Sequence, residues 1–211
     1  MIAPRPLPRI ARNTSGVAMI EFAFAAPLLL TLILGGVEVA NYALAHLRVS
    51  EIAVTVADNA GRVPTGIDES NIYEVFDGAA TVGESIDFEA NGRVILSSLE
   101  HNGLTGSNEG QVINWQRCWG SLDQQSLYGI ENFGETNAAL EDGMGAAGNQ
   151  ITSIEGTAVM FAEVVYDYQP LLQFGIFEPD QIRYESAFNV RGRVANNLTN
   201  ANSLARMVCG S

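Results

Sequence analysis

Residues 17–61 decide the fold of this chain, and they read VAMIEFAFAAPLLLTLILGGVEVANYALAHLRVSEIAVTVADNAG. The stretch from Val17 to Val37 contains a single charged side chain, that of Glu21. As a helix it would be roughly 31 Å long, which matches the apolar core of a bilayer at about 30 Å. We therefore expect a membrane-spanning helix, in preference to the buried core helix of a soluble domain.

The helical pattern continues beyond the apolar stretch. Apolar residues keep a helical spacing from Val39 to Val56, with charged residues between them. Gly61 and Pro64 then interrupt the pattern. We predict one helix over residues 17–61, whose outer half packs on an exported domain.

The charges predict the orientation of this helix. Arg5, Arg9 and Arg12 precede it in a segment without acidic residues. The rest of the chain carries all 24 acidic residues and the other eight of the 11 basic ones, and the net charge is −13. Because basic segments stay in the cytoplasm, residues 1–16 are predicted to be a cytoplasmic leader. The acidic surface disfavours nucleic acid as a partner.

A cleaved secretory signal is the alternative to a membrane anchor. Ala43-Leu44-Ala45 has the small-x-small pattern of a cleavage site, and the three Arg suit the start of a signal. Against it, the apolar stretch is longer than a typical signal core, and Glu21 lies near its start.

Glu21 is a carboxylate within the apolar zone, a position that costs about 2.5–3.5 kcal/mol at the bilayer centre and less near its edge. If the chain were cut after Gly16, Val17 would carry a free α-amine one helical turn away. The ammonium and the carboxylate could then neutralise each other, within one chain or between neighbours. Alternatively, Glu21 reaches the interface and has no partner.

Three further positions affect the shape of the helix. Pro27 removes a backbone hydrogen bond and predicts a kink. Gly35 and Gly36 add a second soft point, and small residues allow helices to approach closely in lipid. Gly35 and Gly36 are equally compatible with a membrane helix that has no helix partner.

The order of these residues resembles a known family. Gly16-Val17 followed by Glu21-Phe22 is similar to the processing site of the type IV pilin class. The longer pattern is similar to the TadE-like minor pseudopilins of tight-adherence (Flp/Tad) pilus systems, and it comprises Glu21-Phe22-Ala23, Pro27-Leu28-Leu29-Leu30 and Gly35-Gly36-Val37-Glu38. The resemblance covers residues 16–60.

This resemblance implies a processing step and a set of partners. A prepilin peptidase would cut after Gly16, and Val17 would become the first residue, open to N-methylation. The mature chain would act in pilus assembly, for adhesion and biofilm, with other pilins or pseudopilins and the inner-membrane assembly platform. It would be a single-pass protein of the bacterial inner membrane, with a cytoplasmic N-terminus and a periplasmic or extracytoplasmic domain that can enter the pilus.

Residues 62–211 predict a small exported α+β domain, an antiparallel sheet of about four strands against the long helix. Asp68 suits the N-cap of a helix over Glu69–Ala80, and a helical turn is expected over Thr136–Met144. The predicted strands are β-prone and bounded by Gly or Pro: Arg93–Leu99 and Gln111–Arg117, which form a hairpin, then Thr157–Tyr168 and Ile182–Arg191. The apolar segment Leu171–Phe177 is expected to be a buried connection, or else a contact patch.

Cys118 and Cys209 are the only cysteines, and an exported domain favours a disulfide between them over two buried thiols. Their spacing to His46 and His101 does not suit zinc, so no metal site is predicted. No sequence motif for catalysis, a cofactor or a small-molecule substrate is present. An uncleaved anchored adhesin or binding module is the first alternative function, and an anchored hydrolase that uses carboxylates is the second.

Overall fold

The computed structural model describes residues 15–172, 181–193 and 195–210. Most of the predicted leader and the greater part of the apolar segment Leu171–Phe177 therefore lie outside the described residues. The helices are α1 (Ser15–Arg62), α2 (Glu69–Gly83) and α3 (Phe88–Asn91), with short 3-10 turns η2 (Glu84–Ile86) and η3 (Gly106–Asn108). The strands are β1 (Gly92–His101), β2 (Gln111–Trp119), β3 (Ala158–Asp167) and β4 (Gln181–Asn189).

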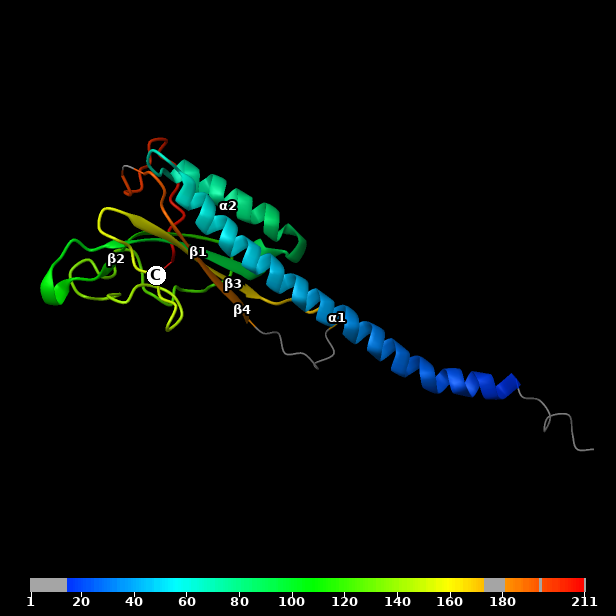
Figure 1. The fold of residues 1–211 in the computed structure, drawn as a ribbon. Helices are drawn as coiled ribbons and strands as arrows, with labels where there is room; N and C mark the ends of the chain where they lie inside the picture. Colours follow the sequence, from blue (N-terminus) through cyan, green and yellow to red (C-terminus); the bar gives the residue numbers. More distant parts are fainter. Residues whose placement is uncertain (1–14, 173–180, 194, 211) are drawn as a thin grey trace, which may run out of the picture.

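The α+β class is confirmed. The four strands form one antiparallel sheet in the order β2-β1-β3-β4. Figure 1 shows α1 and α2 on one face of this sheet, with the blue N-terminal part of α1 projecting far from the domain. The predicted hairpin of Arg93–Leu99 with Gln111–Arg117 is the β1-β2 pair.

The main core lies between the sheet and the two helices. The buried side of α1 supplies small and β-branched residues, which allow the helix to lie close to the strands. Aromatic side chains of α2, α3 and the sheet fill the remaining space, and Phe88 stacks between Trp119 and Tyr166. Members of this core include Val49, Ile52, Val56, Ile72, Phe76, Val94, Leu96, Met160 and Val164.

The N-terminus of α2 has the predicted cap. The Asp68 carboxylate accepts a hydrogen bond from the Ser70 backbone N–H at 3.1 Å, and the Asn71 side chain accepts one from the Asp68 N–H at 3.1 Å. The helix runs to Gly83, three residues beyond the predicted end. A Cβ at Gly83 would lie 2.6 Å from that of Phe88, so the turn into α3 needs glycine.

The connection between β2 and β3 covers the other face of the sheet. A second core of Leu99, Ile113, Met144, Val159 and Phe161 lies beneath it. The expected helical turn over Thr136–Met144 is wrong, because this segment forms non-helical turns and bends. Leu140 and Gly143 have φ values of 56° and 87°, which a right-handed helix cannot contain.

The sequence left two interpretations open for the segment Leu171–Phe177, a buried connection and an exposed contact patch. Of its described residues, Leu171 has a side chain that is 60% exposed. The backbone N–H of the next residue, Leu172, points to α1 and donates to Glu38. The segment is therefore attached to α1 at its first residues through the backbone, while the Leu171 side chain faces outward.

The outer edge of β2 is covered along its length. The loop after β2 returns to the strand, where the Asn132 N–H donates to the Ile113 carbonyl at 2.7 Å and the Ile113 N–H donates to the Phe133 carbonyl at 3.0 Å. Near the end of β2, the Cys118 N–H donates to the Met207 carbonyl of the C-terminal tail at 2.7 Å. The predicted disulfide between Cys118 and Cys209 is present and fixes this tail to the strand.

Candidate functional site

The N-terminal part of α1 has no buried residue before Glu38. Its large apolar side chains face outward along the whole stretch, with Phe24 80% and Leu32 66% exposed. It is the one described helix that is long and apolar enough to cross a membrane. A surface of this kind is stable only when lipid or other protein covers it.

The residues of the predicted processing site lie in the first two turns of α1. Gly16, Val17, Glu21 and Phe22 are all exposed, and Val17 and Glu21 are one turn apart on the same side of the helix. Within the described part of the chain, no hydrogen bond or ion pair holds the Glu21 carboxylate. The described fold therefore leaves the Glu21 carboxylate without a partner. A carboxylate without a partner can pair with a new α-amine or with a group on another chain.

Pro27 lies inside α1, and Figure 1 shows the helix changing direction in its blue N-terminal part. The Thr31 hydroxyl donates to the Pro27 carbonyl at 2.8 Å. Beside the proline is an apolar groove of about 300 Å³, lined by Phe22, Ala25, Ala26, Leu28, Leu29 and Leu32. Gly35 and Gly36 have no atom within 4 Å of where a Cβ would be, so they leave the helix surface open to a neighbour.

Glu38 is the first buried residue of α1 and marks the junction between its free and packed halves. Its carboxylate is 1% exposed and accepts hydrogen bonds from the Tyr168 hydroxyl at 2.7 Å and the Leu172 N–H at 3.1 Å. The Asn41 amide donates to the same Tyr168 oxygen at 2.8 Å. Burial, with the contact to Glu38, raises the pKa of Tyr168 to about 12, so its hydroxyl remains a donor at neutral pH.

Aromatic residues extend this junction along α1. Tyr42 packs edge-to-face against both His46 and Tyr168, and His46 Nδ1 lies 3.2 Å from the Tyr184 hydroxyl of β4. We assigned no role to Glu38 or to these rings from the sequence. The available signal was a carboxylate directly after the apolar stretch, followed by polar and aromatic residues at helical spacing.

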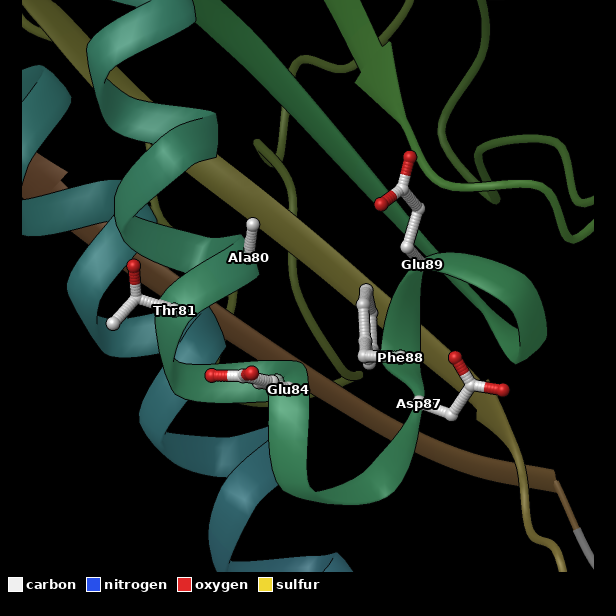
Figure 2. Close-up of a pocket in the computed structure, with 7 residues that line it drawn as sticks. Ala80, Thr81, Glu84, Asp87, Phe88 and Glu89 are labelled. Atoms are coloured by element: carbon white, nitrogen blue, oxygen red, sulfur yellow. The ribbon is translucent and has the colours of Figure 1, made fainter.

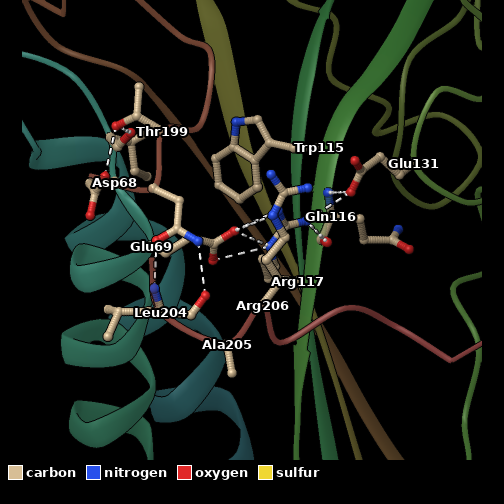
Figure 3. Close-up of polar contacts among 12 residues, drawn as sticks. Asp68, Glu69, Trp115, Gln116, Arg117, Glu131, Thr199, Leu204, Ala205 and Arg206 are labelled. Carbon is tan, nitrogen blue, oxygen red and sulfur yellow. Dashed lines mark hydrogen bonds and ion pairs between the residues drawn. The ribbon is translucent and has the colours of Figure 1, made fainter. Parts of the chain in front are cut away.

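The far end of the domain is fixed by a buried ion pair (Figure 3). The Arg117 guanidinium of β2 donates three hydrogen bonds to the Glu69 carboxylate of α2, of 2.9, 3.2 and 2.6 Å. The two side chains are 4% and 1% exposed. A further bond of 2.8 Å reaches Glu131 in the loop after β2. This network joins helix, strand and loop.

An acidic pocket of about 360 Å³ lies at the turn from α2 to α3, lined in part by Glu84, Asp87 and Glu89. Figure 2 shows the three carboxylates pointing in different directions. Over the described residues, no group of three His, Cys, Asp or Glu side chains could hold a metal ion. His101 faces Glu109 at 3.6 Å and accepts from the Gly103 N–H, an arrangement that fixes a loop.

Comparison with known proteins supports the N-terminal pattern. No curated protein and no solved structure matches the chain. Residues 16–58, which include the residues of the predicted processing site, Pro27, Gly35 and Gly36, match the family model described as TadE-like protein. The matched segment comprises the exposed apolar part of α1 together with the part that packs on the sheet, and in this segment the resemblance to the TadE-like family is confirmed.

Proposed function

We propose that this protein is a minor pseudopilin that acts in the assembly of a Flp/Tad-type pilus. The observation that carries the proposal is the Gly16–Glu21 spacing at the head of α1, whose large apolar side chains are exposed from Val17 to Val37. The match to the TadE-like model over residues 16–58 suggests a Tad pilus-associated protein. The specific role and the processing step are our inference from these two facts.

In this proposal a prepilin peptidase removes residues 1–16 at the cytoplasmic face of the inner membrane. The new α-amine of Val17 lies one turn from Glu21, and the pair sets the register of α1 against a neighbouring pilin-class helix. An ion pair within the bilayer is favoured because neither charge can be hydrated there. The anchor keeps the protein in the bacterial inner membrane, with the sheet domain on the extracytoplasmic side.

The exposed part of α1 supplies the surface for that neighbour. The groove beside Pro27 and the open backbone at Gly35 and Gly36 are the two places where another helix can approach closely. Other pilins or pseudopilins and the assembly platform are the proposed partners. Among the described residues we find no arrangement that favours an enzyme, and the TadE-like family suggests a non-enzymatic role.

The proposal is tested by replacing Glu21 in the native host. Glu21→Ala should still be processed, but incorporation of the protein into the pilus or its base should fall strongly. Glu51→Ala is the matched control, because Glu51 is an exposed carboxylate on the same helix, outside the apolar stretch. Equal pilus yield from Glu21→Ala and Glu51→Ala would contradict the proposal, and an uncleaved anchored adhesin would then be favoured.

A further inference from the structure

The two edges of the sheet differ in how they are covered. The outer edge of β2 is hydrogen-bonded to its following loop and to the C-terminal tail, as described above. The other edge is β4, a strand of nine residues without proline, lysine or a bulge. Folded proteins normally block a long edge strand, because its unpaired backbone groups bind other strands.

The pairing register shows which backbone groups of β4 are open. The Val190 N–H donates to the Ala158 carbonyl at 2.9 Å, so Val190 and Ala158 are a hydrogen-bonded pair. Hydrogen-bonded pairs alternate along an antiparallel ladder. Tyr184 and Ser186 therefore bond to β3, and the backbone groups of Arg183, Glu185 and Ala187 point away from the sheet.

These outward groups lack a backbone partner among the described residues. The first outward N–H beyond the strand, that of Arg191, donates to the Gly61 carbonyl at the end of α1. Before that point the edge has donors and acceptors at a two-residue spacing, which is the pattern that an added β-strand recognises. The residues from Arg183 to Phe188 are half-buried, so this stretch of β4 is partly exposed among the described residues.

A second copy of this chain does not fit the edge as a symmetric antiparallel pair. His46 of α1 contacts Tyr184, and Gly61 of α1 contacts Arg191, so α1 and β4 run in the same direction. A two-fold antiparallel pairing of β4 with β4 would make the α1 helices of the two copies point in opposite directions. Two copies anchored by α1 in one membrane cannot adopt that arrangement.

The charges on β4 indicate the kind of strand that fits. Arg183 is held by the buried Glu163 carboxylate at 3.2 Å, while Glu185 accepts from the Tyr128 hydroxyl at 2.9 Å. This cluster of two carboxylates and one guanidinium favours a basic side chain directly opposite Glu185. On the α1 side of the sheet, the neighbours of an added strand would be Tyr184 and Phe188, which favour apolar residues.

We propose that the outer edge of β4 binds an extended segment of a different polypeptide, with apolar and basic side chains in alternation. The segment adds a fifth strand through the backbone groups of Arg183, Glu185 and Ala187. The inference is independent of whether residues 1–16 are removed.

The test uses the full chain in detergent micelles and a fluorescent nine-residue peptide of sequence TVKVTVKVT. The peptide should bind, and the same peptide with N-methylated amides should not. Ala187→Pro removes one outward N–H without breaking the β3 ladder, so affinity for the peptide should fall about tenfold. Ala187→Val changes the side chain and keeps the N–H, so it should bind the peptide like the wild type.

Amide hydrogen exchange gives a second measurement that does not depend on a variant. In the isolated protein the amides of Arg183, Glu185 and Ala187 should exchange much faster than those of Tyr184 and Ser186, and the peptide should protect them. Equal binding of the N-methylated peptide would overturn the inference. Protection of the outward amides before the peptide is added would also overturn the inference. If that protection did not depend on protein concentration, a segment of the same chain would be covering the edge. If it did, a second copy of the chain would be covering it.

Discussion

The Glu38 carboxylate accepts a hydrogen bond from the Tyr168 hydroxyl at 2.7 Å, and this contact joins the first buried residue of α1 to the segment that follows β3. Its second donor is the Leu172 N–H. The contact therefore fixes α1 to the segment after β3 at the point where the packed part of the helix begins.

Glu38→Ala should destabilise the sheet domain by about 1–3 kcal/mol, because Tyr168 and Leu172 lose the acceptor of their hydrogen bonds. Tyr168→Phe should also cost about 1–3 kcal/mol, since it removes the hydrogen bond to Glu38 and leaves the Asn41 amide without its acceptor. Denaturant unfolding of the detergent-solubilised protein measures both, with Glu51→Ala as an exposed control on the same helix. Equal stabilities of Glu38→Ala and Glu51→Ala would contradict a buried role for Glu38.

Acid should weaken the start of α2. The pKa of Asp68 is lowered to about 2, chiefly because the Ala201 N–H donates to its carboxylate, with further bonds from Ser70 and Thr199. A carboxyl with a lowered folded-state pKa contributes stability above its unfolded pKa, near 4, and loses it as the pH falls through its folded value. Stability should therefore fall between about pH 4 and pH 2.

Asp68→Asn keeps a capping side chain but cannot titrate, so it should flatten this part of the pH profile. Glu74→Gln, on the exposed side of α2, should leave the slope unchanged. Urea midpoints at several values across the window measure the effect. Burial raises the pKa of Glu163. The stability that a group with a raised folded-state pKa contributes is lost as the pH rises above its unfolded pKa. The effect of Glu163 on stability therefore lies above the range of about pH 2 to pH 4. A wild-type slope in Asp68→Asn would show that another group causes the acid effect.

Arg117→Leu should destabilise the domain by about 3–5 kcal/mol, because it leaves the Glu69 carboxylate buried without its partner. The matched control is Arg48→Leu. Arg48 pairs with Glu51 at the surface, where both side chains are about half exposed, and such pairs contribute about 1 kcal/mol or less. Thermal or urea unfolding of the two variants decides the comparison. Similar losses of stability in the two variants would mean that the buried ion pair stabilises the domain no more than the surface pair does.

Cys209→Ser should lower the stability of the oxidised protein by about 2–5 kcal/mol, since the bond closes a long loop in the unfolded chain. A reducing agent should produce the same loss in the wild type and none in the variant. The reduced tail should also leave β2, which would expose the Cys118 amide to exchange. A wild-type protein that is insensitive to reductant would show that the disulfide does not support the fold.

The helices and strands were largely predictable because their signals are local. The apolar stretch and Gly61 place the long helix within two residues of its observed ends, and Asp68 gives the start of α2. All four strands were found at their β-prone runs. The turns over Thr136–Met144 were missed, because helix-forming residues there are overridden by the positive φ values at Leu140 and Gly143.

The long-range features could not be derived from one sequence. The strand order, the cover of β2 by the C-terminal tail and the burial of Glu38 depend on segments that are distant along the chain. Glu38 is the clearest case, because a carboxylate after an apolar stretch is usually an exposed boundary residue. Its donors, Tyr168 and Leu172, are about 130 residues away. The processing residues have a strong local pattern, and their role stays a prediction.

The intact mass and N-terminal sequence of the protein, extracted from the membranes of its native host, test the central claim most directly. We predict a chain that begins at Val17, with or without an added methyl group. Gly16→Val should retain the full-length mass, while Gly36→Val, the same change at an open position of the same helix, should be cut normally. A wild-type chain that retains residues 1–16, or that begins at His46, would contradict pilin-class processing and with it the proposed function.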